Sequence, residues 1–143
     1  MRRRYGRAFL KPVLRPIERF GSGGTYEAEI GYSRTVRAGD LVLVSGCTAT
    51  SAGGVVLGPG DPLAQARAAL DACERALALA GAGLADVVRT RMYVTDITQW
   101  KLVGQAHAER FGDARPVATM VEVSGLIDPR MLVEIEVEAY LPR

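Results

Sequence analysis

The segment VEIEVEAYL, residues 133–141, alternates apolar and acidic side chains over its first six positions. In a β-strand this spacing sends Glu134, Glu136 and Glu138 to one face of the sheet, and the apolar residues between them to the other. The apolar side is expected to meet a layer of helices. The segment therefore predicts a strand with one covered face and one face lined by three carboxylates.

A first helix is predicted from Pro62 to about Ala80. Asp61 can cap its open backbone N–H groups, and a proline suits the first helical position because no N–H is needed there. Apolar residues recur along the segment at spacings of four, three and four, which is typical of an amphipathic helix lying on a sheet. Gly81 or Gly83 can end the helix in the left-handed conformation.

A second helix is predicted from about Gln99 to Phe111, where Trp100, Val103 and His107 form a stripe. His107 is the only histidine in the chain. A lone histidine on such a stripe is more often a packing residue than a catalyst. It could serve as a proton carrier if its end of the helix borders a cleft.

Strands are predicted in the other apolar or alternating segments. Residues 41–46 form an apolar run that suits a central strand covered on both faces. In residues 85–96, alternation should place Val88 on one face, opposite Arg91 and Tyr93. The other expected strands are one strand or a pair within residues 26–38, a short return after a loop at residues 51–54, and strands at residues 117–123 and 131–141.

This order of elements predicts an α+β domain with both helices on one face of a mixed sheet. A chain of 143 residues with 48% hydrophobic content can bury one core and is too short for two ordinary domains, so one domain is expected at residues 17–143. The second face of the sheet has no cover within the chain. Another subunit would cover it most easily, so a homo-oligomer is expected. That face should carry Arg89, Arg91, Tyr93, Glu134 and Glu136.

Residues 1–16 form a basic extension with six Lys or Arg residues and no acid. Subtracting these six from the chain's 18 basic residues leaves 12 against 16 acidic ones, a net charge of −4. Binding of nucleic acid is not expected, because such a domain lacks the basic surface patch that groove-type binding needs. The extension could touch an acidic partner or be disordered.

The chain has no apolar stretch of about 18 residues or more, so no membrane-spanning helix is expected. The amino-terminal segment lacks the apolar run of a secretory signal, which favours a cytoplasmic protein. Cys47 and Cys73 are far apart and have no histidine pair nearby, so neither a metal site nor a disulfide framework is expected. Both are interpreted as small buried hydrophobic residues.

Three segments stand in an order that resembles the YjgF/RidA family: GYSRTVRAGDLVLVSG, ADVVRTRMYVTDI and RPVATMVEVSGLIDPRMLVEIEVEAYL. The resemblance covers nearly the whole domain. It implies a chorismate-mutase-like homotrimer with helices outside, sheets facing inward and clefts between neighbouring subunits. The best-known family members hydrolyse reactive enamines and imines to keto acids and ammonia, and no cofactor is expected.

By this resemblance, Glu134 matches the cleft glutamate that positions a water in active deaminases, and Tyr32 matches the cleft tyrosine. Ser45 and Gly46 match the pair that ends the second strand, where backbone groups approach the ligand. Cys47 stands where the family commonly has glutamine. Glu134 could act as a general base, because a carboxylate beside apolar surface has a raised pKa and gains basicity.

The chain departs from the family at Ala118 in RPVATMVEV. Family deaminases carry an arginine there that forks onto the substrate carboxylate, and the neighbouring Thr119 matches a hydroxyl residue. Alanine cannot donate such charge-assisted bonds, so standard 2-imino-acid deaminase activity is not expected. Arg91 and Arg115 are the candidates to replace the missing arginine. The alternative for both is a surface or salt-bridge role, and the alternative for Glu134 is a structural ion pair with Arg89 or Arg91 across the sheet.

Three functions follow as hypotheses. The first is an enzyme that hydrolyses a small enamine, imine or carbonyl compound lacking the usual carboxylate, with Tyr32, Ser45 and Glu134 around a water. The second is a non-catalytic binding module whose inter-subunit cleft holds a neutral metabolite, which the loss of the charged anchor at Ala118 favours. The third is the ribonuclease or translation-inhibitor activity attributed to some family members, supported only by the basic extension.

Overall fold

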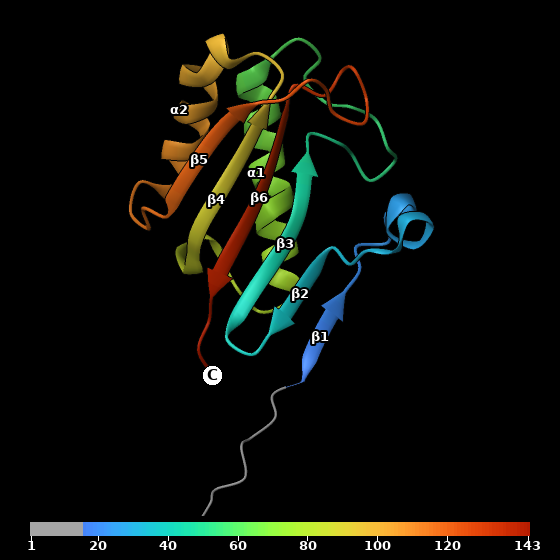
Figure 1. Ribbon diagram of the computed structural model, residues 1–143, viewed down its shortest axis with the longest axis vertical. Coiled ribbons are helices and arrows are strands. Elements are labelled where there is room, and N and C mark those ends of the chain that lie inside the picture. The colour runs from blue at the N-terminus through green and yellow to red at the C-terminus, as the bar shows by residue number, and fades with distance from the viewer. Residues whose placement is uncertain (1–15) are drawn as a thin grey trace, which may run out of the picture.

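In the computed structural model, which describes residues 16–143, the chain forms one mixed sheet with both helices on the same face (Figure 1). This arrangement confirms the expected α+β class. Of the expected extension at residues 1–16, only Pro16 lies within the described residues. The strands are β1 (Ile17–Phe20), β2 (Thr35–Ala38), β3 (Leu41–Thr48), β4 (Val87–Val94), β5 (Val117–Glu122) and β6 (Val133–Tyr140). The helices are α1 (Pro62–Leu79) and α2 (Trp100–Phe111), and the shorter helical turns are η1 (Glu27–Gly31), η2 (Leu84–Asp86) and η3 (Ile97–Gln99).

The last strand of the chain lies in the middle of the sheet. The strand order is β1-β2-β3-β6-β4-β5, and each neighbouring pair is antiparallel except β4 and β5. α1 connects β3 to β4, and α2 connects β4 to β5, so both crossovers run on one side of the sheet (Figure 1). The alternating segment at residues 133–141 is therefore a central strand, paired with β3 on one side and with β4 on the other.

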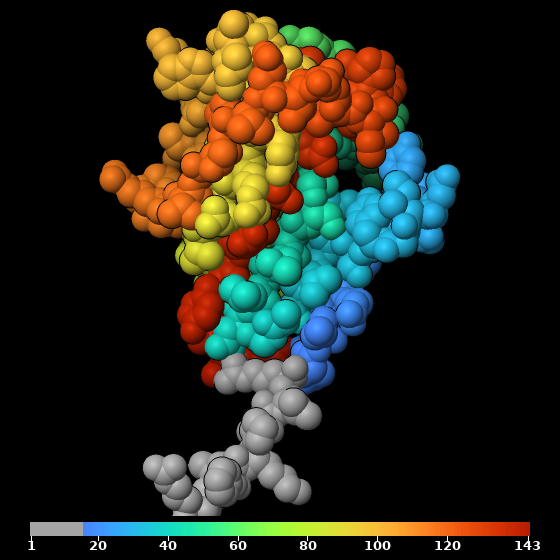
Figure 2. Space-filling model, viewed as in Figure 1, coloured from blue at the N-terminus to red at the C-terminus, as the bar shows by residue number. Residues whose placement is uncertain are grey.

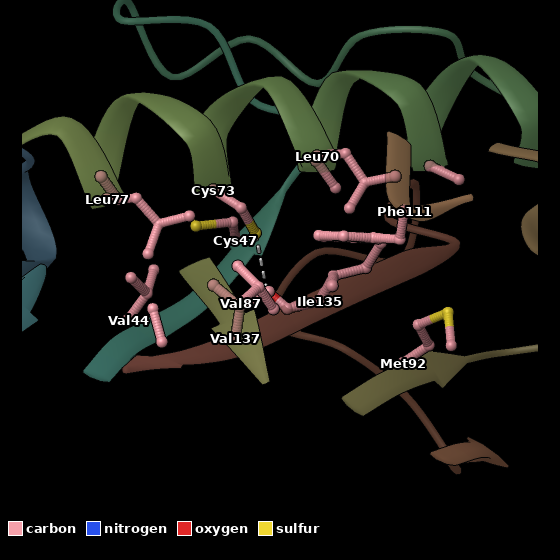
Figure 3. Packing of buried hydrophobic residues seen from close by; sticks show 14 of the residues in the cluster. Val44, Cys47, Leu70, Cys73, Leu77, Val87, Met92, Phe111, Ile135 and Val137 are labelled. Atoms are coloured by element: carbon pink, nitrogen blue, oxygen red, sulfur yellow. Dashed lines mark hydrogen bonds between the residues drawn. The ribbon is translucent and has the colours of Figure 1, made fainter. Parts of the chain in front are cut away.

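The hydrophobic core lies between α1 and the sheet (Figure 3). The predicted apolar stripe of α1 is fully buried there, and the side chains of Cys47 and Cys73 lie next to each other. Val133, Ile135 and Val137 of β6 face this core with at most 1% of their surface exposed. Because strand side chains alternate, the three glutamates of β6 face the opposite side, as the sequence predicts.

Local chemistry sets both ends of α1. The Asp61 carboxylate accepts a hydrogen bond from the Ala64 N–H at 3.0 Å, and Pro62 is the first helical residue. Gly81 follows the helix with a φ of 80°, a left-handed conformation that glycine adopts without strain. The predicted start is confirmed, and the helix ends at Leu79. Within the described residues, neither helix combines the length and apolarity that a membrane crossing requires.

The sheet face opposite the helices has no covering layer among residues 16–143, and Figure 2 shows it from the front. Leu41 is 46% exposed and Leu43 40% exposed on this face. The expectation that residues 41–46 are covered on both faces is therefore wrong for the single chain. We call this surface the open face; it is formed by Leu41, Leu43, Arg89, Arg91, Tyr93, Val117, Thr119, Val121, Glu134, Glu136 and Glu138.

The amino-terminal part of the domain differs from the predicted opening strands. Residues 27–31 form the turn η1, because the buried Glu27 carboxylate accepts hydrogen bonds from the N–H groups of Ser22 at 2.8 Å and Gly24 at 3.1 Å. β2 is the only part of residues 26–38 that forms a strand. Its outer neighbour is β1, whose four residues are too short to show a pattern in the sequence.

A bulge in β4 overturns the expected face of Val88. The register between β4 and β6 shifts between Val87 and Arg89, so Val87 is buried at 3% exposure and Val88 is 46% exposed. An extra residue in one strand reverses the faces of the side chains before it. Beyond the bulge, Arg91 and Tyr93 lie on the open face as predicted.

Candidate functional site

The three carboxylates of β6 differ in their contacts. Glu136 accepts a hydrogen bond from the Tyr93 hydroxyl, and Glu138 pairs with Arg91 at 2.9 Å. The side chain of Glu134 is half-buried and makes no hydrogen bond or ion pair with any described residue, so the ion pair considered as its alternative role does not form within one chain. Burial, followed by the nearby negative charge of Glu136, raises the pKa of Glu134 above its ordinary value.

The approach of Glu134 explains why glycine stands at position 46. A bulge shifts the pairing of β3 with β6 between Val44 and Cys47, and the backbone of Gly46 lies directly against the Glu134 side chain. A Cβ atom at position 46 would lie 2.1 Å from Oε1 of Glu134 and 2.9 Å from its carboxyl carbon. A residue with a side chain at position 46 would therefore force the Glu134 side chain to move from this place.

Arg34 lies beside these residues, and we call Tyr32, Arg34, Gly46 and Glu134 the cluster. Its guanidinium donates to the carbonyls of Gly46 at 2.8 Å and Ser45 at 3.3 Å, and to the Tyr32 hydroxyl at 3.3 Å. Its positive charge also opposes the rise in the pKa of Glu134. One signal could have revealed it: Tyr32 and Arg34 are two residues apart just before the predicted strand, a spacing that in extended backbone places two side chains on the same side.

The side chains of Ser45 and Cys47 contact the protein's own backbone and core. The Ser45 hydroxyl donates to the Ser33 carbonyl at 2.5 Å, and its N–H donates to the Arg34 carbonyl at 3.0 Å, so both donors are already used. Cys47 is buried and its thiol faces the helix layer beside Cys73 (Figure 3). A hydrogen bond with Cys73 lowers the pKa of the Cys47 thiol against the effect of burial, and the charge of Arg34 adds to this. Neither residue directs its side chain toward a ligand on the open face.

Ala118 and Thr119 do not join the cluster within one chain. They lie on the edge strand β5, and β4 separates them from β6. Thr119 pairs with Arg91 and lies on the open face, whereas Ala118 pairs with the buried Thr90 and points the other way. Both residues are exposed. The two residues are therefore two strands away from Glu134.

The two arginines considered as replacements are already engaged. Arg91 forms ion pairs with Glu138 at 2.9 Å and with Glu136 at 3.7 Å. Arg115 is exposed beyond α2, where its Nε donates to the Gly112 carbonyl at 3.1 Å. Within one chain, Arg91 therefore lies in salt bridges and Arg115 on the surface.

His107 lies in the helix layer, behind the sheet. Its Nε2 is 2.8 Å from Oγ1 of Thr90, and its ring centre is 4.7 Å from that of Phe111. Burial lowers the pKa of His107, which favours the neutral ring. The sheet separates this histidine from Glu134, so the structure places it in a packing role and does not bring it to the cluster.

Two cavities lie near the domain surface, and one of them reaches the cluster. A cavity of about 320 Å³ is lined by Arg34, Ser22 and the α1 residues Arg75 and Ala76, among others. A cavity of about 580 Å³ lies between the starts of α1 and α2 and is lined by none of the predicted site residues. Figure 2 shows the open face hollowed between η1, the end of β3 and the loop before β6. No group of three metal-ligating side chains occurs in the described part of the chain.

The fold and the cluster define a class of small α+β domain with an open sheet face and a glycine-backed carboxylate on its central strand. The family model described as Endoribonuclease L-PSP matches residues 24–141. The chain therefore belongs to the YjgF/RidA family.

Individual relatives support the same assignment. The crystal structure of Rv2704 from Mycobacterium tuberculosis, a YjgF/YER057c/UK114 family member, is 52% identical in sequence, covers 88% of this chain and 100% of its own, and has a TM-score of 0.80. The SCO2049 protein of Streptomyces coelicolor is 42% identical over 124 residues, which are 87% of this chain and 92% of that protein. The 3-aminoacrylate deaminase RutC of Acinetobacter baylyi is 32% identical over 110 residues, 77% of this chain and 86% of that protein.

Proposed function

We propose that the chain hydrolyses a small neutral imine, enamine or carbonyl compound, with Glu134 activating the water. The observation that carries this proposal is the Glu134 carboxylate, which is half-buried, has no bonded partner among the described residues and has a raised pKa. A carboxylate with a raised pKa is a stronger base once it is ionised. Its neighbours on the strand are held in bonds with Tyr93 and Arg91 and cannot take this role.

For an imine, the reaction balances with one water. The water oxygen bonds to the imine carbon while Glu134 takes a proton from the water and returns it to the nitrogen. The C–N bond of the resulting amino alcohol then breaks, a carbonyl forms, and the hydroxyl proton leaves with the nitrogen as ammonia. One imine and one water thus give one carbonyl compound and one ammonia.

The neutral substrate follows from Ala118. Leaving a carboxylate without a paired cation in a partly dry cleft costs several kcal/mol, on the order of a thousandfold or more in affinity. The relative RutC, which is named for deamination of 3-aminoacrylate, supports deamination as the reaction class. The change at position 118 favours a substrate without the carboxylate.

The proposed site lies between subunits of a chorismate-mutase-like homotrimer. The exposed Leu41 and Leu43 leave apolar surface on the open face that a second copy would cover. In one chain, the family positions 118 and 119 are two strands away from Glu134. A neighbouring subunit that packs against the open face would supply its own β5 to complete the cleft.

The test compares the wild type with Glu134→Gln on imines generated in situ, with ammonia release as the readout. Loss of turnover in Glu134→Gln is expected, because glutamine cannot accept the proton from water. Glu138→Gln is the matched control, since it makes the same chemical change on the same strand and face, at a residue paired with Arg91. Background-level rates for both the wild type and Glu134→Gln would rule out water activation.

A second function is favoured by the same residue, Ala118. Loss of the charged anchor in a retained fold also fits a module that binds a neutral metabolite and turns nothing over. A ligand that raises the melting temperature of the wild type without being consumed would identify this case. The endoribonuclease activity in the family's description has less support, because residues 17–143 carry more acidic than basic side chains.

A further inference from the structure

The hydrogen bond between Arg34 and Tyr32 determines whether the Tyr32 hydroxyl can donate or accept a further hydrogen bond. A guanidinium has only donors, so the Tyr32 oxygen accepts the bond from Arg34 at 3.3 Å. The hydroxyl proton of Tyr32 then points elsewhere, and no described residue accepts it. Tyr32 therefore has one donor available for a bound molecule.

Arg34 is held firmly enough to act as a support. Its Nη1 donates to the Gly46 carbonyl at 2.8 Å and to the Ser45 carbonyl at 3.3 Å, and both carbonyls lie in the bulge of β3. The same glycine backs the Glu134 carboxylate. One guanidinium thus ties the Tyr32 hydroxyl to the backbone on which Glu134 rests.

We infer that Arg34 is a positioning residue that makes Tyr32 a hydrogen-bond donor toward the ligand. This pair selects small neutral molecules with an acceptor oxygen, such as amides and ketones, over carboxylates. This inference rests on the proposed function for the location of the site, but it does not require turnover. Tyr32 and Arg34 would then recognise the ligand in a site that has no arginine at position 118.

The charge balance around the cluster explains the preference for a neutral ligand. Arg34 carries one positive charge, and Glu134, once ionised, carries one negative charge that no ion pair neutralises. A carboxylate ligand would be repelled by the ionised Glu134, while the Arg34 guanidinium is already bonded to the Ser45 and Gly46 carbonyls and to the Tyr32 hydroxyl. A carbonyl oxygen needs only the single donor that Tyr32 offers.

The hydrogen bond from Tyr32 to the ligand oxygen would become stronger during hydrolysis. As water adds to a carbonyl carbon, negative charge grows on the carbonyl oxygen, which is the atom that the Tyr32 donor would bind. The guanidinium behind Tyr32 supports the donor, so the developing charge is stabilised without an arginine in direct contact. Arg34 therefore acts through Tyr32 and does not itself touch the reacting atoms.

The test uses the full chain and titrates it with acetamide and, separately, with acetate, followed by NMR. Saturable shifts at Tyr32 and Gly46 with acetamide, and binding of acetate at least about tenfold weaker, are expected. Tyr32→Phe and Arg34→Met should each weaken acetamide binding about tenfold, and Arg34→Lys should recover part of the loss. Arg75→Met is the matched control, because Arg75 lines the adjoining cavity and makes none of the Arg34 contacts.

A second readout separates positioning from simple structural support. Removing the positive charge in Arg34→Met should raise the pKa of the Glu134 carboxyl further, whereas Arg75→Met should leave it unchanged. Glu136 and Tyr93 also influence this region and are the same in both variants.

Three results would overturn the inference: no saturable acetamide binding to the wild type, acetate binding as tightly as acetamide, or unchanged acetamide affinity in both Tyr32→Phe and Arg34→Met. Tyr32→Phe keeps the test decisive if Arg34→Met fails to fold. Acetamide binding without any imine hydrolysis would refute the proposed catalysis and support ligand recognition by Tyr32 and Arg34. Hydrolysis that does not depend on Tyr32 or Arg34 would support the catalysis and refute this recognition.

Discussion

The Glu134 side chain lies in the space that a side chain at position 46 would enter. A methyl group at position 46 would overlap the Glu134 carboxylate, so Gly46→Ala is expected to cost about 1–3 kcal/mol in the free energy of unfolding. Urea denaturation would measure this loss. Gly125→Ala is the control, because nothing lies within 4 Å of a Cβ built there. In a Glu134→Ala background the same change at position 46 should cost much less, and an equal cost in both backgrounds would contradict the overlap.

Glu134 should also weaken the folded state at neutral pH. Its pKa is higher in the folded chain than in the unfolded one, so ionising it disfavours folding. This cost is complete above the folded pKa and disappears as the pH falls below the unfolded value. Glu134→Gln is therefore expected to melt at a higher temperature than the wild type at pH 7.

Thermal melts across pH check the sign of this effect. The advantage of Glu134→Gln should shrink toward zero by about pH 3.5, where the carboxyl of the wild type is protonated in both states. Glu138→Gln removes an ion pair with Arg91 and should not stabilise the protein at pH 7. A Glu134→Gln variant that is less stable than the wild type at pH 7 would show that the carboxylate has a structural role.

At the scale of elements, α1 joins two loops through one buried side chain. The Gln65 amide donates to the carbonyls of Arg130 at 2.8 Å and Gly58 at 3.3 Å, and its oxygen accepts from the Leu132 N–H at 2.7 Å. Gln65→Leu keeps the bulk but leaves these groups unpaired, at an expected cost of about 3 kcal/mol in urea denaturation. Gln105→Leu, on the exposed side of α2, should stay within about 0.5 kcal/mol of the wild type. Similar values for the two variants would show that the three bonds contribute little.

The elements that could be predicted from the sequence are those whose own residues carry the signal. α1 has a cap at Asp61 and a long apolar stripe, and β6 alternates over its length, so both were placed within a residue or two. β1 is short, η1 depends on the carboxylate of Glu27, and the bulge at Val88 depends on pairing with β6. Such features arise from contacts between segments, which periodicity along one segment does not record.

In the candidate site, too, some features follow from one segment of sequence and others from contacts between segments. Glu134 could be assigned to the open face from alternation alone. The role of Gly46 could not be derived from spacing, because it depends on a bulge in β3 and on a side chain 88 positions away. The role of Arg34 could not be derived from spacing for a similar reason, since its partners are carbonyls of the next strand. The place of His107 behind the sheet follows from the side of the sheet on which both crossovers run.

At the scale of the whole molecule, the open face decides whether the site is complete. Its charged residues other than Glu134 are paired with one another, while Leu41 and Leu43 at one side and Val117 and Val121 at the other leave apolar surface exposed. A paired centre with apolar margins suits a surface that packs against copies of itself. The proposed homotrimer accounts for both margins, because each subunit would use β3 against one neighbour and β5 against the other.

Native mass measurement at micromolar concentration tests this arrangement. The wild type is expected at about 46 kDa, three times the 15.3 kDa chain. Leu43→Glu places a carboxylate opposite Glu138 on the open face, so it should shift the mass toward the monomer with an unchanged circular dichroism spectrum. Leu79→Glu is the matched control, because Leu79 is equally exposed, at 40%, but lies on α1. A 15 kDa wild type, or equal effects of the two substitutions, would remove the open face as the subunit interface and with it the neighbour's β5 from the site.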